Sequence, residues 1–327
     1  MSGIYHVLAV AGGLTLFLFG LNLMRSALIK LNNEKLKGIL SKATGSKFRA
    51  LITGILATVL VQSSSGVTAI SVALICADLL TLSQGLMIMI GANIGTTATA
   101  FIFTLQIEKF SLVFVILGYI LLLSRKERIS TIGTMIVGFG ILFLGIDIMN
   151  AGLSFISESR YFLNMMLLLS ENALNSFLGG ALISALLQSS SVTIGLSQNL
   201  YAIGAIGLKP AVGIMLGANV GTAVASLVVA VSSTKEAKAA LYVNVLFNLV
   251  GGGIFLIVIS PFSKLIALLE GFIPNKKLSI AYSHLIFNVL TAFLFFFIHD
   301  KVVLFVQKRL NSRNKLTEKK HYDMIIS

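Results

Sequence analysis

The chain has 327 residues, of which 56% are hydrophobic and 11% are charged, and its mean hydropathy is +0.95. Soluble domains carry roughly 25% charged residues, so a soluble globular fold is excluded. The formal net charge of +13 does not indicate nucleic-acid binding, because the basic residues gather between apolar runs, as in cytoplasmic loops. The composition predicts a multi-pass protein of the cell inner (plasma) membrane, surrounded by the lipid bilayer.

Several chemistries have no support in the sequence. Cys76 is the only cysteine and lies in an apolar run, which excludes an intrachain disulfide and a cysteine-based metal site. No nucleophile–base set, zinc spacing or phosphate-binding P-loop appears, so we expect neither an enzyme nor a transition-metal protein. The N-terminus lacks the basic region and cleavage site of a signal peptide, and its apolar run is interpreted as a retained first helix.

The predicted elements follow one another as apolar spans, because about 20 apolar residues suffice to cross a bilayer as a helix. A first span over residues 4–24 is followed by a basic connector to residue 49. The expected apolar stretches after it are 50–77, 79–103, 110–123, 129–149, 239–259 and 280–298, with a polar tail at the end.

An internal duplication relates the two halves of the chain. Gln188–Ser191 repeats Gln62–Ser65 at an offset of 126 positions (188 − 62), and Gly217–Thr222 repeats Gly91–Thr96 at the same offset (217 − 91). We therefore predict a first transmembrane repeat over 1–128 and a second repeat core over 129–236. Final transmembrane helices over 237–300 and a cytoplasmic tail over 301–327 complete the chain.

The basic segments predict opposite orientations for the two repeats. If residues 25–49 and 125–128 are cytoplasmic, the first helix runs inward and its repeat partner, 129–149, runs outward. Inverted repeats of this kind are typical of secondary transporters. One segment, 260–279, argues weakly against this orientation, because it would lie outside and yet contains three lysines.

Each Gln-Ser-Ser-Ser motif has about 13 apolar residues on either side, too few to cross about 30 Å of hydrocarbon. A re-entrant hairpin fits better, and its broken backbone is tolerated only inside protein or along a watery cavity. The predicted fold class is an all-α polytopic membrane protein of two inverted-topology repeats, with re-entrant helical hairpins and broken transmembrane helices. One hairpin would enter from each face, and their tips would meet near the midplane.

The hairpin tips are predicted to bind an oxyanion such as phosphate. The second half of each hairpin begins within the serine run, where unpaired N–H groups and the helix dipole attract anions. The candidate phosphate-binding residues are Ser63, Ser64, Ser65, Ser189, Ser190 and Ser191. The alternative is that these serines only hold helices together in lipid.

The glycine-rich motifs are interpreted as unwound helix segments that bind a cation. Their glycines would release backbone carbonyls, and Asn93, Thr96, Asn219 and Thr222 would add side-chain oxygens, as in the broken helices of transporters. The alternative is Gly-xxx-Gly helix packing. The apolar spans contain no Lys or Arg, so a buried phosphate would need co-bound cations to offset its charge.

Other polar residues within the apolar spans have open roles. Asp147 is the clearest acid within a predicted span, and either a cation-binding or a water-facing position suits it. Asp78 is interpreted as a connector residue and His284 as a packing or interface histidine. Asn244, Asn248 and Asn288 are candidates for interhelical hydrogen bonds.

The paired Gln-Ser-Ser-Ser motifs, each followed by Gly-Ala-Asn-Ile/Val-Gly-Thr, resemble the type II sodium-dependent phosphate cotransporter family. The resemblance covers residues 10–300 and implies hairpins that bind both phosphate and sodium. It adds hairpin residues to the predicted sodium ligands, which are then Gln62, Thr68, Asn93, Thr96, Gln188, Thr193, Asn219 and Thr222. Many bacterial relatives carry a soluble PhoU-like domain after the last span, and the short tail here indicates a short form without it.

The sequence thus predicts a secondary active transporter that couples sodium influx to uptake of inorganic phosphate by alternating access. Inorganic phosphate and Na⁺ are its expected partners, Na⁺ is the coupling ion and no cofactor is expected. An anion channel, a transporter for sulfate or arsenate, and a membrane sensor without transport stay open as alternatives. A homodimer is a further hypothesis.

Overall fold

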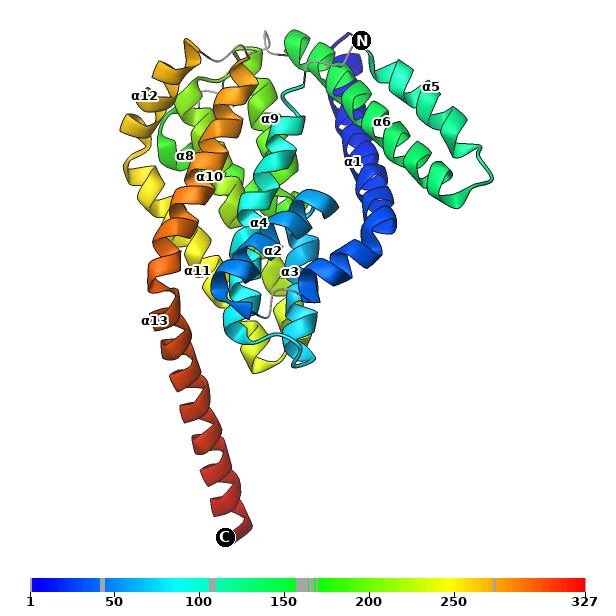
Figure 1. The fold of residues 1–327 in the computed structure, drawn as a ribbon. Coiled ribbons are helices and arrows are strands. Elements are labelled where there is room, and N and C mark those ends of the chain that lie inside the picture. The colour runs from blue at the N-terminus through cyan, green and yellow to red at the C-terminus, as the bar shows by residue number, and fades with distance from the viewer. Residues whose placement is uncertain are drawn as a thin grey trace.

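A computed structural model describes residues 2–41, 45–105, 110–156, 164, 168, 170–272 and 275–326. Within these residues the chain is helical and has no strand (Figure 1). The helices are α1 (Ser2–Ser41), α2 (Lys47–Val61), α3 (Ser64–Cys76), α4 (Leu82–Ile102), α5 (Ser111–Leu122), α6 (Glu127–Ile156), α8 (Ala173–Leu187), α9 (Ser190–Ala202), α10 (Leu208–Ala225), the 3₁₀ helix η3 (Ser226–Ser232), α11 (Lys235–Ile257), α12 (Ile259–Glu270) and α13 (Lys276–Ile326).

Six of the described helices are long and apolar enough to cross a membrane. They lie in α1, α4, α6, the α10–η3 segment, α11 and α13, and the all-α polytopic membrane fold is thus confirmed. The first membrane helix is longer than predicted, since α1 continues through the expected connector to Ser41. The amphipathic helix α12 was not predicted either, because a basic loop was expected over those residues.

The duplication appears as matching structure. Helices α8, α9 and α10 begin 126 residues after α2, α3 and α4 (173 − 47, 190 − 64, 208 − 82). At 15 and 13 residues, the two arms of each hairpin are about 20 Å long at 1.5 Å per residue, shorter than the hydrocarbon core. Both hairpins return toward the face they come from, as predicted.

The two hairpins enter from opposite ends of the molecule (Figure 1). In that view α1 and α13 both run downward, and the α5–α6 turn lies at the lower end of its helix pair. The basic residues at the end of α1, in the α5–α6 turn and at the end of α13 therefore lie at the lower ends of their own helices, the direction that the positive-inside rule favours for cytoplasmic ends. The predicted inverted arrangement is confirmed, with both tips inside the helical core.

The predicted unwinding of residues 91–97 and 217–222 is wrong, because α4 and α10 are helical throughout. Their glycines serve close packing instead. A Cβ atom at Gly91 would lie 2.1 Å from the Leu51 carbonyl oxygen of α2, and one at Gly217 would lie 1.9 Å from the Phe177 carbonyl oxygen of α8. The Gly-xxx-Gly alternative therefore accounts for the glycines, which let neighbouring backbones touch.

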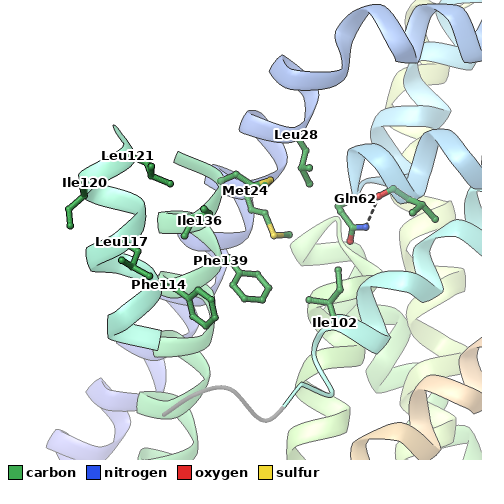
Figure 2. A pocket seen from close by; sticks show the side chains of 12 residues that line it. Met24, Leu28, Gln62, Ile102, Phe114, Leu117, Ile120, Leu121, Ile136 and Phe139 are labelled. Atoms are coloured by element: carbon green, nitrogen blue, oxygen red, sulfur yellow. Dashed lines mark hydrogen bonds between the residues drawn. The ribbon is translucent and has the colours of Figure 1, made fainter. Parts of the chain in front are cut away.

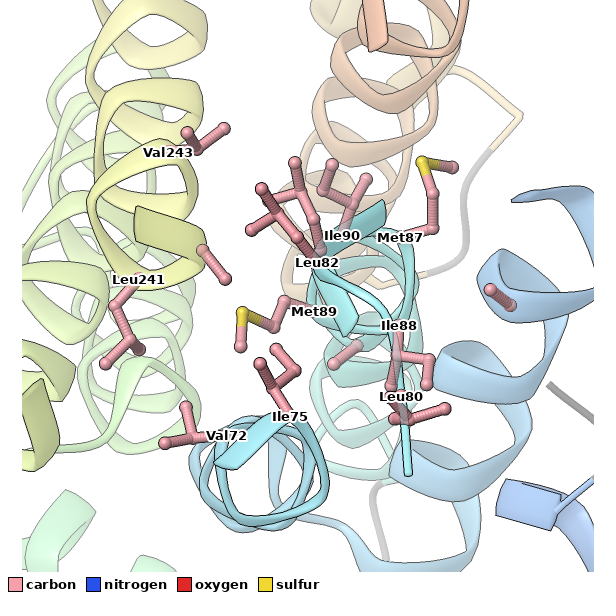
Figure 3. Close-up of a cluster of buried hydrophobic side chains, with 14 of the residues drawn as sticks. Val72, Ile75, Leu80, Leu82, Met87, Ile88, Met89, Ile90, Leu241 and Val243 are labelled. Atoms are coloured by element: carbon pink, nitrogen blue, oxygen red, sulfur yellow. The ribbon is translucent and has the colours of Figure 1, made fainter. Parts of the chain in front are cut away.

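The hairpins pack around helices that are apolar on every side. In α4, the run Leu86–Ile90 is completely buried, which requires protein neighbours all around. Figure 3 shows this run between Val72 and Ile75 of α3 on one side and Leu241 and Val243 of α11 on another. Helices α4, α10, α11 and α13 thus contact the arms of the two hairpins.

An arm of three helices, α1, α5 and α6, leans away from this core (Figure 1). Glycines join α1 to α6, since a Cβ at Gly20 would lie 2.4 Å from the Leu142 backbone nitrogen. The arm contacts the core through α2 and through a hydrophobic cluster in which the rings of Phe17 and Phe103 lie 5.1 Å apart. Between the arm and the core lies a cavity described below.

Candidate functional site

The two hairpin tips have nearly the same backbone. Gln62 and Gln188 close α2 and α8 in the left-handed conformation, with φ of 56° and 50°. Ser63 and Ser189 follow in extended conformation, with φ of −150° and −151°. The Ser63 hydroxyl accepts a hydrogen bond from the Gly66 N–H at 3.1 Å, whereas Ser189 makes no side-chain cap. The repeated motif thus sets one turn geometry twice.

A small polar cavity lies where the two tips meet. It is lined by residues of both repeats and of α11, namely Ser64, Ser65, Thr68, Asn93, Ser190, Asn219, Thr222, Ala223, Ser226 and Asn244. Its volume is about 20 Å³, which is room for roughly one water-sized species. None of these described lining residues is charged, so the cavity that they form is polar and formally neutral.

Seven of the fourteen predicted site residues line this cavity: Ser64, Ser65, Thr68, Asn93, Ser190, Asn219 and Thr222. The Thr96 and Thr193 hydroxyls are instead bonded within their helices, to the carbonyls of Ala92 and Ser189. Ser63, Ser189 and Ser191 lie in the same tips but outside the lining. The sequence prediction missed Ser226 as a lining residue and gave Asn244 only a role in helix contact.

Both helix amino termini of the tips face the cavity, since Ser64 and Ser190 are the first residues of α3 and α9. Their unpaired N–H groups and the two helix dipoles make the cavity electrostatically positive. The Asn93 amide nitrogen and the Asn244 amide oxygen are both buried without a partner. The cavity therefore offers donors for an anion and an acceptor for a cation.

Asn219 is held by its neighbours rather than free. Its amide nitrogen donates to the Met215 carbonyl at 2.9 Å, and its amide oxygen lies 3.2 Å from Nε2 of His284. Because that oxygen can only accept, the His284 proton belongs on Nε2. His284 packs at 0% exposure, as predicted, and in addition it fixes the orientation of Asn219.

The two acids singled out in the sequence lie away from the cavity. Asp147 is exposed on α6, and Asp78 is exposed in the α3–α4 connection with φ of 56°. Neither lines the polar cavity, so a cation role in that cavity has no support for either acid, and Asp78 lies in a connection as predicted. Within the described residues no three His, Cys, Asp or Glu side chains form a group that could hold a metal ion.

The two tip glutamines, both predicted as sodium ligands, lie outside the polar cavity and differ from each other. Gln62 is 5% exposed; its amide nitrogen donates to the Val59 carbonyl at 2.7 Å, and its oxygen accepts from the Thr99 hydroxyl at 2.8 Å. The position equivalent to Thr99 is Ala225 (99 + 126), and the Gln188 side chain is exposed. Gln62 therefore ties the first tip to α4, whereas the second hairpin is tied to α10 through the Ser184 hydroxyl, which bonds the Ala218 carbonyl and the Thr222 hydroxyl.

This difference predicts opposite effects of glycine at the two tips. Glycine adopts positive φ without strain, so Gln188→Gly should leave the thermal unfolding midpoint in detergent unchanged or raise it. Gln62→Gly gains the same relief but leaves the buried Thr99 hydroxyl unpaired, at a cost of about 1–3 kcal/mol. Its midpoint should fall. Equal shifts for the two variants would contradict the asymmetry.

The fold and the site define a class of membrane protein in which two inverted repeats close re-entrant hairpins on one polar cavity, as in many secondary transporters. Residues 16–151 and 154–272 match the family described as Na+/Pi-cotransporter. The chain belongs to this Na⁺/phosphate cotransporter family. It is a family of transporters and not of enzymes.

Curated relatives support this assignment. The Bacillus subtilis protein named "Uncharacterized protein YqeW" is 29% identical over 85% of this chain and 90% of its own length. The Escherichia coli protein named "Putative inorganic phosphate export protein YjbB" is 26% identical over 99% of this chain, which spans 59% of YjbB. The human "Sodium-dependent phosphate transport protein 2B" is 37% identical over 30% of this chain and 14% of its own length. No solved structure matches the chain significantly.

Proposed function

We propose that this protein is a secondary active transporter of the cell inner membrane that couples sodium influx to uptake of inorganic phosphate by alternating access. The observation that carries the proposal is the meeting of two serine-bearing helix amino termini, one from each inverted repeat, at one neutral polar cavity. Such termini bind phosphate groups in many folds. The family membership supports the same substrate.

In this proposal the anion is bound by the hydroxyls and first N–H groups around Ser64, Ser65 and Ser190. Helix ends supply only partial positive charge, equivalent to roughly half a unit each. Phosphate carries one to two negative charges near neutral pH, two such ends offset about one, and burying an unpaired charge is prohibitive. Sodium bound beside the dibasic ion would supply the remainder, which supports coupling to a cation.

The sodium ions would take oxygen ligands next to the anion. Thr68 and Thr222 bring hydroxyl oxygens to the cavity wall, and Asn244 brings an amide oxygen that has no other partner. In other transporters the carbonyl oxygens of unwound helices bind sodium; here α4 and α10 are unbroken, and neutral side-chain oxygens would take that part. Ser226 adds a hydroxyl from η3, beyond the repeated motifs.

The size of the cavity supports a moving rather than a static site. At about 20 Å³ it holds roughly one water-sized species, and phosphate has four oxygens around its phosphorus. The tips must separate to admit phosphate, and each tip belongs to a hairpin that opens toward its own face of the membrane. If one tip moves at a time, the cavity opens to one face of the membrane and then to the other, which is alternating access. An anion channel would instead need the paths to both faces open together.

The tests start from the purified protein in liposomes loaded with potassium salts. Uptake of radiolabelled phosphate should be concentrative with an inward sodium gradient and absent when potassium replaces sodium. Ser64→Ala and Ser190→Ala should each lower the initial rate at least about tenfold, the effect of a lost interaction worth about 1.4 kcal/mol. Ser71→Ala and Ser197→Ala are matched controls, since these serines lie deeper in α3 and α9, bond to backbone carbonyls and should leave uptake intact.

The alternatives give different results in the same vesicles. Phosphate flux that ignores sodium would favour a channel, and sodium-driven uptake of labelled sulfate or arsenate without uptake of phosphate would assign the site to another oxyanion. Because YjbB carries export in its name, release from phosphate-loaded vesicles is measured as well. Release that runs only outward would replace uptake by export as the direction.

A further inference from the structure

A second cavity, large and apolar, lies between the arm and the first hairpin tip. Its volume is about 700 Å³, and it is lined by side chains of α1, α2, α4, α5 and α6 and by Gln62. Figure 2 shows Met24 of α1, Phe139 of α6 and Leu117 of α5 on the arm side, with Gln62 and Ile102 across from them. We propose that this cavity binds an acyl chain of a membrane lipid.

The lining excludes a polar ligand. Among the described residues that line the cavity, Gln62 is the only polar one, and both ends of its amide are already bonded, to Val59 and Thr99. A charged or hydrogen-bonding molecule would leave its polar groups unpaired here, at high cost. The ligand must therefore be hydrocarbon over most of its surface.

The position of the cavity selects a lipid. Met24 and Leu28 lie within the membrane span of α1, and Met135 and Phe139 lie within that of α6. The arm side is open, since Leu117 and Ile120 on α5 are 52% and 59% exposed. At this depth the surrounding solvent is acyl chains, and a chain can enter sideways between α5 and the core.

The size of the cavity suits a chain rather than a small apolar molecule. An engineered apolar cavity of about 150 Å³ stays dry and takes one benzene, and this cavity is several times larger. Apolar walls separated by this volume make few contacts with one another, so they gain packing contacts from hydrocarbon that lies between them. A flexible hydrocarbon chain restores those contacts without any specific shape.

The lipid would occupy the space between two parts that move in alternating access. The arm is joined to the core mainly through α1, and Gln62 at the tip of the first hairpin forms part of the cavity wall. A chain in this space keeps the arm from collapsing onto the tip and lets the tip slide against fluid hydrocarbon. The binding of the chain itself does not depend on which ion the protein transports.

The sequence offers a clean optical test because it contains no tryptophan. Phe139→Trp places a reporter on the cavity wall, and Phe114→Trp, whose ring lies 5.3 Å from that of Phe139, is a second reporter if the first does not fold. Each variant is reconstituted in vesicles of phosphatidylethanolamine and phosphatidylglycerol, with or without bromine atoms on the acyl chains. Bromine quenches tryptophan only on close contact.

Two control variants set the upper and lower limits of tryptophan quenching by brominated lipid. Ile116→Trp on the outer face of α5, 60% exposed, reports full contact with bulk lipid, and Phe287→Trp, 1% exposed in the core, reports none. We expect bromine to quench Phe139→Trp to an extent close to Ile116→Trp, and iodide in the water to have no effect on it. Quenching no greater than that of Phe287→Trp, or quenching by iodide, would overturn the proposal and leave a closed or water-filled cavity.

Discussion

Gly217→Ala should markedly lower the thermal unfolding midpoint although it adds a single methyl group. The new Cβ would lie 1.9 Å from the Phe177 carbonyl oxygen and 2.8 Å from the Ala181 backbone nitrogen. Both are backbone atoms of α8, so no side-chain rotation relieves the clash, and α8 must move away from α10. Overpacking typically costs about 1–3 kcal/mol and more where backbone must shift, a large share of a stability of about 5–15 kcal/mol. The measurements are the yield of monodisperse protein and its thermal unfolding midpoint in detergent.

Gly253→Ala is the matched control for this change. It places the same methyl group inside α11, where nothing lies within 4 Å of the new Cβ. Alanine is favoured over glycine in a helix interior by about 0.5–1 kcal/mol, so its midpoint should stay or rise. If Gly217→Ala unfolded at the same temperature as Gly253→Ala, the close α8–α10 packing would be refuted.

The architecture could be predicted because duplication left two independent copies of each signal. One serine-rich break in an apolar stretch is ambiguous, but Gln62–Ser65 and Gln188–Ser191 at a fixed offset point to one turn built twice. The length of the apolar arms then favoured a re-entrant hairpin over two membrane spans, since arms of 15 and 13 residues are too short to cross the hydrocarbon core. The basic segments indicated the orientation of the two repeats, because such segments are expected on the cytoplasmic side of the membrane.

The glycine-rich motifs could not be resolved from sequence, because glycine serves two opposed purposes. It weakens a helix and it also permits close packing of one helix on another. Which effect dominates at Gly91 depends on whether a neighbouring backbone is present, and here the Leu51 carbonyl lies against it. That neighbour is 40 positions away in the chain (91 − 51) and belongs to the hairpin, so only the fold reveals it.

The candidate site was predicted only in part for a similar reason. Residues within the repeated motifs, such as Ser64 and Ser190, could be found by their spacing. Asn244 and Ser226 lie outside those motifs, and only the packing of α11 and η3 brings them to the cavity. The matching motifs also hide a difference, since Thr99 supports the first tip and Ala225 takes its place at the second.

Ser190→Asp should abolish phosphate uptake while its isosteric partner Ser190→Asn keeps a measurable part of it. Ser190 is the first residue of α9, is 5% exposed and lines the polar cavity. A carboxylate is favoured at a helix amino terminus, so the fold should accept it, but the carboxylate would occupy the positive site itself. Two unit charges about 4 Å apart repel by about 4 kcal/mol at an effective dielectric of 20, which corresponds to roughly a thousandfold loss of phosphate affinity. Initial rates of sodium-driven phosphate uptake in liposomes measure the effect.

The comparison of Ser190→Asp with Ser190→Asn separates an anion site from a packing site. Both variants add nearly the same volume to the tip, so any cost of crowding between the hairpins is shared. If Ser190 only holds helices together, the two variants should lose uptake to the same degree, and phosphate should protect both equally from thermal unfolding. A large gap between them, with unfolding midpoints that agree in the absence of phosphate, can come only from the added negative charge. That result would place the transported anion at the amino terminus of α9, and equal losses would remove it from there.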